Sequence, residues 1–231
     1  MREQALSYLD KSPLLNASMT EPIRRNMAEI LAAEETGVLI RLLSEAIFML
    51  SADSREKGME LLEQVQEPEM VVVHQKFLIE PVKKKYGFKR DNICDQAVYT
   101  GKTPLSVRPD ADIRRLDMQY YEFLTEHYHL MESPEYMAEL IELGVMHGIF
   151  ENGQLAGFMG MHTEGSMGIL EILPEYQRRG YGTELQKYMI NFCLERGWTP
   201  FGQIIVGNKE SLGLQKKLGM ELAPGKVTWL Y

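Results

Sequence analysis

In the second half of the chain, apolar positions recur at helical spacing in some segments and at strand spacing in others. Between residues 182 and 196 they include Leu185 and Met189, and this pattern predicts an amphipathic helix. Asn152-Gly153 separates two apolar runs and predicts a β-hairpin. The other elements expected here are strands at 105–108, 148–150, 154–161, 167–173, 201–206 and 227–231, and helices at 110 to about 131, from 134 onward and at 211–218.

The first half contains a similar mixture of patterns. Helical spacing occurs at 4–9, 21–33, 55–65 and 78–86, and strand-like runs occur at 37–42, 46–50, 70–74 and 95–99. Interleaved strands and helices of this kind are typical of a sheet that is covered by helices. The predicted fold class is therefore α/β, in the form of an α+β mixed sheet.

An internal repeat connects the two halves. The heptapeptide at 82–88 resembles the one at 214–220, and Gly219 follows Gly87 after 132 residues. At the same offset, further identities or similar residues fall on each other without a gap: Leu62 on Leu194, Pro68 on Pro200, Val72-Val73 on Ile204-Ile205, and Tyr99 on Tyr231. So few identities do not exclude chance, but the shared order of elements favours a duplication.

The stretch 100–110 is the only plausible linker, because it contains Gly101, Pro104 and Pro109. We therefore expect two domains, residues 1–103 and residues 104–231. The ungapped offset places Phe48 and Leu50 opposite Gly180 and Gly182. The first domain is accordingly expected to be a degenerate copy that cannot do what these glycines do.

Charge and composition exclude some classes of protein. The net charge of -8 argues against a nucleic-acid binder, which needs a basic face. No apolar run approaches the ~20 residues of a membrane span, and no signal sequence follows Met1, so a cytoplasmic location without membrane partners is expected. Cys94 and Cys193 lack metal-ligand spacing and are expected to be buried, reduced thiols. No metal site is predicted.

The segment 169–182 is the most informative for function. It begins as a strand, turns at Pro174, and places Gly180 and Gly182 at the start of the predicted helix. Glycines let a backbone approach a ligand, and the N–H groups and dipole at a helix N-terminus favour an anion. Arg178 and Arg179 add positive charge beside them. The pattern predicts a cradle for a diphosphate.

In this context the segment resembles the pyrophosphate motif of the GNAT superfamily, Q/R-x-x-G-x-G/A, as Gln177-Arg178-Arg179-Gly180-Tyr181-Gly182. A second family signature follows, with Asn208, Ser211 and Lys217-Leu218-Gly219-Met220. The resemblance covers 105–231 and is closest to the FR47-like and glycine N-acyltransferase-like branch. The competing dinucleotide motif, G-x-G-x-x-G, is not met because its third glycine would be at Leu185.

The resemblance implies an acyltransferase (a transferase) that uses an acyl-CoA, chiefly acetyl-CoA, and acylates a primary amine of a small molecule. It implies that coenzyme A lies between two splayed parallel strands. The residues implied to contact it are Ile172 and Leu173 for the pantetheine arm, Gln177, Arg178, Arg179, Gly180, Tyr181 and Gly182 for the pyrophosphate, and Asn208 and Ser211 from the next helix. A main-chain N–H of the strand is implied to stabilise the oxyanion.

Catalytic groups are less well defined by the sequence. Many relatives have a tyrosine as general acid where this chain has Gln215, so the thiolate must leave unassisted or with help from another group such as Tyr231. Glu171, the single charge in its strand, is the first candidate base, and Glu164 is the second. A purely structural carboxylate is the alternative for Glu171. For the whole chain, the alternative is a non-catalytic module that binds or senses acyl-CoA.

Overall fold

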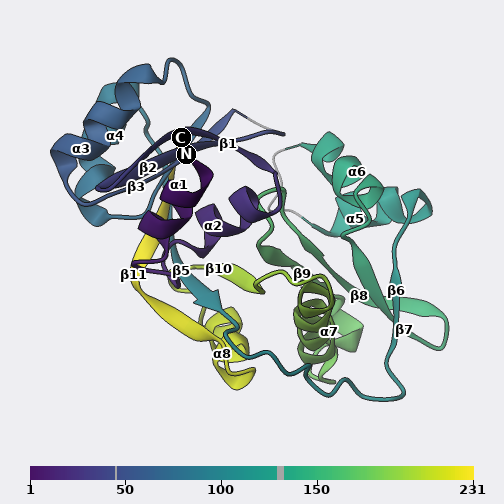
Figure 1. Cartoon of the computed structure of the whole chain (residues 1–231). Helices are drawn as coiled ribbons and strands as arrows, with labels where there is room; N and C mark the ends of the chain where they lie inside the picture. The colour runs from purple at the N-terminus through teal and green to yellow at the C-terminus, as the bar shows by residue number, and fades with distance from the viewer. Residues whose placement is uncertain (45, 129–132) are drawn as a thin grey trace. The chain divides into compact units, whose positions relative to one another are not determined.

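The computed structural model describes residues 1–44, 46–128 and 133–231, which form two compact units (Figure 1). Unit 1 combines Met1–Val98 with Phe201–Tyr231, and unit 2 comprises Tyr99–Pro200. The last strands of the chain thus belong to the same unit as its first half. The units group residues that contact one another, whereas the predicted boundary between residues 103 and 104 separates two copies of a repeat along the sequence. That boundary stays a prediction.

Unit 1 is built on a seven-stranded mixed sheet with the order β1-β2-β3-β4-β11-β5-β10. The pair β3–β4 is parallel and the other neighbours are antiparallel. Its strands are β1 (Ala28–Glu34), β2 (Gly37–Leu42), β3 (Ile47–Ala52), β4 (Met70–Val73), β5 (Asp91–Val98), β10 (Phe201–Ile205) and β11 (Glu221–Leu230). Its helices are α1 (Arg2–Leu9), α2 (Ala17–Arg24), α3 (Arg55–Leu61), α4 (Ile79–Tyr86) and α8 (Lys209–Lys217), with short 3-10 turns at Leu62–Gln64 and Lys76–Leu78.

The central strands of unit 1 are buried on both faces. Along β2, Val38, Ile40 and Leu42 pack with side chains from α1 and α2, whereas Leu39 packs with side chains from α3 and α4. This division follows from the two-residue side-chain period of a strand. It explains why β2 is apolar at almost every position and does not alternate between apolar and polar residues.

Unit 2 is built on a four-stranded antiparallel sheet with the order β6-β7-β8-β9. The strands are β6 (Asp112–Arg115), β7 (His147–Glu151), β8 (Gln154–Met161) and β9 (Met167–Ile172). The helices are α5 (Tyr121–His127), α6 (Pro134–Glu142) and α7 (Tyr181–Glu195), with 3-10 turns at Met118–Tyr120 and Pro174–Tyr176. The sulfur atoms of Met161 in β8 and Cys193 in α7 lie 4.0 Å apart, and Phe158 in β8 packs with Leu124 of α5 and Met137 of α6. The sheet is therefore covered by α7 on one face and by α5 and α6 on the other.

Three sequence predictions about elements are wrong. The helix predicted from 110 to 131 is replaced by β6 and the shorter α5, and its residues 129–131 lie outside the described part of the chain. Asp117 caps the 3-10 turn Met118–Tyr120 that precedes α5, since its carboxylate accepts from the N–H of Gln119 at 3.0 Å. The strand predicted at 105–108 is absent from the described structure. The helix predicted at 21–33 ends at Arg24, and Asn26 then adopts a positive φ of 57° before β1.

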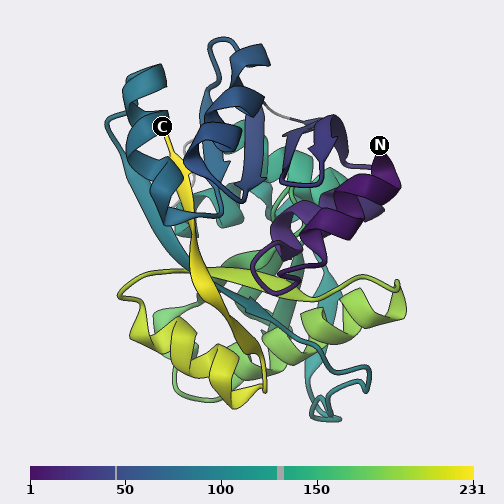
Figure 2. The same ribbon diagram turned by 60° about the vertical axis from the view of Figure 1, so that its left-hand side comes forward.

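The terminal strands of the two halves are exchanged between neighbours. In the repeat, β4 corresponds to β10 and β5 corresponds to β11. Yet β4 pairs with β11, and β10 pairs with β5. Figure 2 shows β11 in yellow running beside β5, with which it also pairs. Each half therefore completes the sheet edge of the other half within unit 1.

The order of elements supports the duplication more strongly than the few identities do. The series α1, α2, β1, β2, β3, α3, β4, α4, β5 has the same order as α5, α6, β7, β8, β9, α7, β10, α8, β11. Matching by element places β3 opposite β9, so that Ser54, the residue before α3, is the counterpart of Gly180, the residue before α7. The ungapped offset, which paired Gly180 with Phe48, does not hold here because α3, with 7 residues, is shorter than α7, with 15.

Candidate functional site

The turn from β9 to α7 forms the predicted cradle in unit 2. It begins where the N–H of Leu173 donates to the carbonyl of Ala156 at 3.0 Å, which ties the end of β9 to β8. A 3-10 turn follows at Pro174–Tyr176, and Gly180 is the residue before the helix. The sequence therefore produces the strand, turn and helix start that an anion site at a helix N-terminus needs.

The main-chain N–H groups of this turn are available. Gly180 adopts the left-handed conformation, with φ of 88°, and no side chain caps the helix. Within the described chain, the N–H groups of residues 178 to 182, which precede or open α7, donate no hydrogen bond to the protein. Unpaired N–H groups and the positive end of the helix dipole together attract a negative ligand.

Backbone conformation and space distinguish the two glycines. At Gly180 an added Cβ would meet no atom within 4 Å, but the positive φ disfavours any L side chain. At Gly182 the nearest atom to such a Cβ would be Cγ1 of Ile172 at 3.6 Å, an ordinary contact. The fold itself thus tolerates a side chain at Gly182, so a requirement for glycine there must come from a ligand. Arg178 also has a positive φ, of 65°, a costly conformation for a residue with a side chain.

Glu151 at the end of β7 holds the turn in place and was missed by the sequence reasoning. Nη1 of Arg179 lies 2.9 Å from Oε2 of Glu151, and the hydroxyl of Tyr181 donates to Oε1 at 2.5 Å. These contacts, with the Tyr181 hydrogen bond as the largest cause, lower the pKa of Glu151 below its ordinary value. The only sequence signal was the position of Glu151 at the predicted hairpin turn. Both arginines are exposed, but Arg179 is paired with Glu151.

The expected pantetheine contacts lie at the end of β9. This strand is last in its sheet, so its second edge has no partner strand within unit 2. Nε2 of Gln177 donates to the carbonyl of Ile172 at 3.1 Å. A ligand that used this carbonyl would displace the Gln177 side chain. The roles of Ile172, Leu173 and Gln177 toward coenzyme A stay predictions.

A β-bulge interrupts β9 just before Glu171. Glu171 lies opposite Phe158 and Gly168 lies opposite Gly160, so two residues of β9 face the single residue between them on β8. Ile169, at the bulge, has φ of 54°, which is rare for a β-branched residue. Bulges re-aim side chains and leave main-chain groups unpaired. This one is a candidate source of the N–H that the resemblance assigns to oxyanion stabilisation.

Glu171 lies on the face of the sheet that α5 and α6 cover. It is directly opposite Phe158, so the two side chains are neighbours on one face. Tyr128, which ends α5, packs edge-on against Phe158 with ring centroids 6.5 Å apart. Burial, followed by the charge of Glu171, raises the pKa of Tyr128 to about 12. No sequence pattern indicated that Tyr128 would lie near Glu171.

Glu164 lies in the turn between β8 and β9 and is 4% exposed. The hydroxyl of Ser166 donates to its carboxylate, and the carbonyl of Ser166 accepts from the N–H of His162 at 2.9 Å. Glu164 is thus built into a closed turn. Its predicted role as the second candidate base stays a prediction, but Glu171, which is partly exposed, is the more accessible carboxylate.

The remaining candidates belong to unit 1. Oδ1 of Asn208 caps α8 by accepting from the N–H of Ser211 at 3.0 Å. The carbonyl of Tyr231 accepts from the N–H groups of Lys89 and Arg90, and the Arg90 guanidinium lies 4.6 Å from the Tyr231 ring centroid. These contacts give Asn208 and Tyr231 structural roles. Their predicted roles in cofactor binding and catalysis, and that of Ser211, stay predictions.

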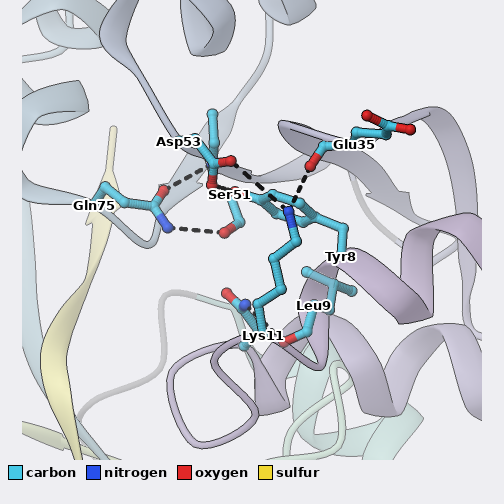
Figure 3. Close-up of polar contacts among 9 residues, drawn as sticks. Tyr8, Leu9, Lys11, Glu35, Ser51, Asp53 and Gln75 are labelled. Carbon is cyan, nitrogen blue, oxygen red and sulfur yellow. Dashed lines mark hydrogen bonds and ion pairs between the residues drawn. The ribbon is translucent and has the colours of Figure 1, made fainter.

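In the first half, the counterpart of the cradle is filled by the protein's own side chains (Figure 3). Strands β3 and β4 pair from Ile47–Met70 to Leu50–Val73. Beyond this ladder, Oε1 of Gln75 accepts from the N–H of Ala52 at 3.0 Å, and its Nε2 donates to Ser51 at 2.8 Å. The Gln75 side chain is therefore hydrogen-bonded to the main-chain N–H at the end of β3, and this N–H is not available to a ligand.

The helix start in this half is also closed to an anion. The Ser54 hydroxyl caps α3 by accepting from the N–H of Lys57 at 3.1 Å. Asp53 adds a negative charge there and accepts from the hydroxyl of Tyr8 at 3.0 Å, with Lys11 3.9 Å away (Figure 3). Burial is the main cause that raises the pKa of Tyr8, so this hydroxyl remains a donor. A phosphate would meet the Asp53 carboxylate where the second half has Arg179, and the capping side chain of Ser54 where it has Gly180.

Two broader features of the described residues concern function. No three His, Cys, Asp or Glu side chains among them are grouped to hold a metal ion. Nor does this part of the chain contain a helix that is long and apolar enough to cross a membrane. Cys94 and Cys193 are buried and are not joined in a disulfide bond, which confirms the predicted burial.

Comparison with known proteins gives one family match and several similar structures. Residues 142–230 match the FR47-like protein family. A solved Drosophila protein is 20% identical, with a TM-score of 0.67 over 84% of this chain and 73% of that one. A GNAT-family protein from Novosphingobium aromaticivorans is 20% identical, with a TM-score of 0.60 over 95% of each chain. A tandem GNAT protein from the clavulanic acid biosynthesis pathway is 13% identical, with a TM-score of 0.53 over 100% of this chain and 93% of its own. No curated protein matches the chain.

Proposed function

We propose that the chain is an acyl-CoA-dependent N-acyltransferase of the GNAT superfamily, because residues 142–230 match the FR47-like family and GNAT-family structures share its fold. The predicted fold, a GNAT fold behind a degenerate GNAT-like half, is confirmed by the order of elements and by the tandem relative. The reaction, the acyl group and the acceptor are proposals.

The cradle before α7 is the observation that supports this function best. Its N–H groups at residues 178 to 182 are unpaired in the described structure, and Gly182 has room for a side chain that the sequence does not supply. Both features fit the pyrophosphate of coenzyme A. Arg178, which is exposed, is the side chain proposed to add charge there, while Arg179 holds the turn through Glu151.

We propose acetyl-CoA as the acyl donor and a primary amine of a small molecule as the acceptor. When bound, acyl-CoA supplies an activated thioester carbonyl. Glu171 would take a proton from the acceptor ammonium so that the neutral amine can attack that carbon. The main chain at the Ile169 bulge would face the developing negative charge on oxygen.

A second candidate function is acyl-CoA binding without turnover. Gln215, at the position where many relatives have an acidic tyrosine, is 5% exposed and cannot donate a proton to the leaving thiolate. A thiol pKa of about 8.5 makes the thiolate an acceptable leaving group without such help. We therefore favour catalysis.

The test of the proposed site is Gly182→Val. The fold has room near the Cβ, so the variant should unfold at a temperature close to that of the wild type, while coenzyme A affinity should fall at least roughly tenfold because the side chain meets the phosphates. Titration calorimetry with coenzyme A measures the affinity. Gly213→Val is the matched control, since Gly213 is also helical and has no atom within 4 Å of an added Cβ.

Unchanged coenzyme A affinity in a folded Gly182→Val protein would rule out the cradle as the phosphate site. A thiol-release assay with acetyl-CoA and primary amines then separates the two functions. Thiol release that depends on the amine supports transfer, whereas binding without release supports the sensing module.

A further inference from the structure

Tyr128 and Glu171 face the same side of the unit 2 sheet, and Phe158 brings them together. Phe158 is fully buried and pairs directly with Glu171 across β8 and β9. The Tyr128 ring packs edge-on against the same Phe158 ring. Side chains that share a neighbour in this way converge above the sheet face that α5 and α6 cover.

The surroundings of this pair are mostly apolar and aromatic. Phe158 belongs to a cluster with Leu124, Met137 and Ile169, and Tyr128 is one of several half-buried aromatic residues packed against it. A carboxylate that is partly exposed beside such a surface interacts strongly with a cation that reaches it, because the local dielectric constant is low. Aromatic faces add further attraction for a cation.

The state of the Tyr128 hydroxyl follows from its position. Burial and the Glu171 charge both disfavour the phenolate and keep the pKa of Tyr128 near 12. The hydroxyl is therefore neutral at neutral pH and can accept one hydrogen bond while it donates another. The neighbouring His127 is turned to its own helix, with Nδ1 2.8 Å from the carbonyl of Phe123. Among the described residues, the charged group that acts on Tyr128 is Glu171.

We propose that Tyr128 is an acceptor-positioning residue: its hydroxyl accepts a hydrogen bond from the acceptor's ammonium group and holds that group against the Glu171 carboxylate. This inference rests on the proposed N-acyltransferase function and names how the acceptor side of that site works. The acceptor class that it selects is a primary ammonium, which has enough N–H donors for both oxygens.

The chemical step balances with these two residues. The ammonium gives one proton to the Glu171 carboxylate and becomes a neutral amine, while Tyr128 keeps its own proton. The nitrogen forms a bond to the thioester carbon, the C–S bond breaks, and its electron pair leaves on sulfur. The second proton lost by nitrogen goes to the thiolate or to solvent, so that an amide and a thiol result.

The test compares Tyr128→Phe with the wild type, using acetyl-CoA and a panel of butylamine, phenethylamine and ethanolamine. A hydrogen bond to a charged group contributes about 1.5–3 kcal/mol, so KM for the best amine should rise roughly 10- to 100-fold. KM for acetyl-CoA and the melting temperature should be unchanged. Tyr86→Phe is the control, because burial also raises the pKa of Tyr86 to about 12 but this tyrosine belongs to unit 1.

A spectroscopic titration of the tyrosines gives a readout that does not depend on activity. In Glu171→Gln the phenolate absorbance assigned to Tyr128, by difference from the Glu171→Gln/Tyr128→Phe double variant, should appear at lower pH than in the wild type. An unshifted titration would overturn the proximity of the two groups.

The outcomes also separate this inference from the proposed function. If the wild type releases no thiol with any amine, the N-acyltransferase proposal fails and the role of Tyr128 fails with it. If the wild type is active and Tyr128→Phe keeps the wild-type KM for the amine, only the Tyr128 inference is overturned.

Discussion

At the scale of single residues, the site depends on where a backbone carries no side chain and on where a charge meets an apolar surface. Gly180 adopts a φ that other residues avoid, and Gly182 has unused space beside it. Glu171 is the partly exposed carboxylate next to the β9 bulge. The two glycines concern coenzyme A binding and Glu171 concerns proton transfer, so substitutions at these positions should affect different measurements.

Glu171→Gln should separate them. If Glu171 is the general base, turnover should fall by ~10²–10⁴, because glutamine keeps the shape but cannot accept the proton. Coenzyme A affinity should stay near the wild-type value, since the cradle is formed by residues after the strand. Steady-state kinetics, calorimetry and a melting curve on one preparation measure all three quantities.

A structural role for Glu171 gives the opposite pattern, with a lower melting temperature and full activity per folded molecule. Full specific activity in a stable Glu171→Gln protein would exclude Glu171 as the base. Glu164→Gln is then the next variant to measure, although the Glu164 carboxylate is held by Ser166 in a closed turn.

At the scale of elements, the exchanged terminal strands join the two halves into one folding unit. Strand β11 pairs with β4 and β5, and β10 has β5 as its neighbour in the sheet. Cutting the chain between residues 103 and 104 would therefore remove both neighbours of β11 and the neighbour of β10. Unpaired apolar strands aggregate or stay disordered, because their N–H and C=O groups and side chains lose their partners.

We expect a fragment of residues 104–231 to lack a cooperative unfolding transition and to bind coenzyme A poorly. Adding a separately produced fragment of residues 1–103 should restore both properties, since it supplies β4 and β5. Circular dichroism melts and calorimetry measure the two effects. A 104–231 fragment that unfolds cooperatively and binds like the full chain would contradict this view of the exchange.

At the scale of the whole molecule, the described part of each unit contains one buried, neutral histidine. In unit 1, His74 is 1% exposed, with Nε2 2.9 Å from the Ser18 hydroxyl and Nδ1 3.0 Å from the carbonyl of Leu50. In unit 2, His147 is 2% exposed and lies between the rings of Tyr188 and Phe192. Burial is the first cause in both cases and lowers each pKa to about 4.

This arrangement predicts a loss of stability in mild acid. A histidine whose folded pKa lies below the unfolded value of 6.5 binds fewer protons when folded, so the free energy of unfolding falls as pH drops from about 6.5 toward 4. Each histidine contributes a slope of up to about 1.4 kcal/mol per pH unit in that window. Urea unfolding at a series of pH values measures the slope.

His147→Phe is the matched variant, since phenylalanine fits between the same rings and does not titrate. The change in its free energy of unfolding per pH unit should be smaller than in the wild type by the contribution of one histidine. The other titrating groups contribute equally in both proteins and do not affect the difference. Equal slopes in the two proteins would show that His147 does not contribute to the acid sensitivity.

The sequence by itself determined the local structures, namely the hairpin at Asn152-Gly153, the amphipathic α7 and the glycine cradle before it. Each of these depends on residues within a few positions of one another, because turn conformation, helix capping and side-chain period are local properties. The fold class and the match of residues 142–230 to the FR47-like family could be predicted for the same reason, since the motifs that carry them are short and contiguous. The element order also supports the repeat that a few identities suggested.

Only the tertiary structure decided the features that join distant residues. The segments 28–33 and 112–115 have weak local preferences, and pairing with neighbouring strands makes them strands. Three features depend on which elements pack together. They are the exchange of β5 and β11, the ion pair between Arg179 and Glu151, and the approach of Tyr128 to Glu171. Packing is set by the summed burial of many side chains across the chain, and no short stretch of sequence contains that information.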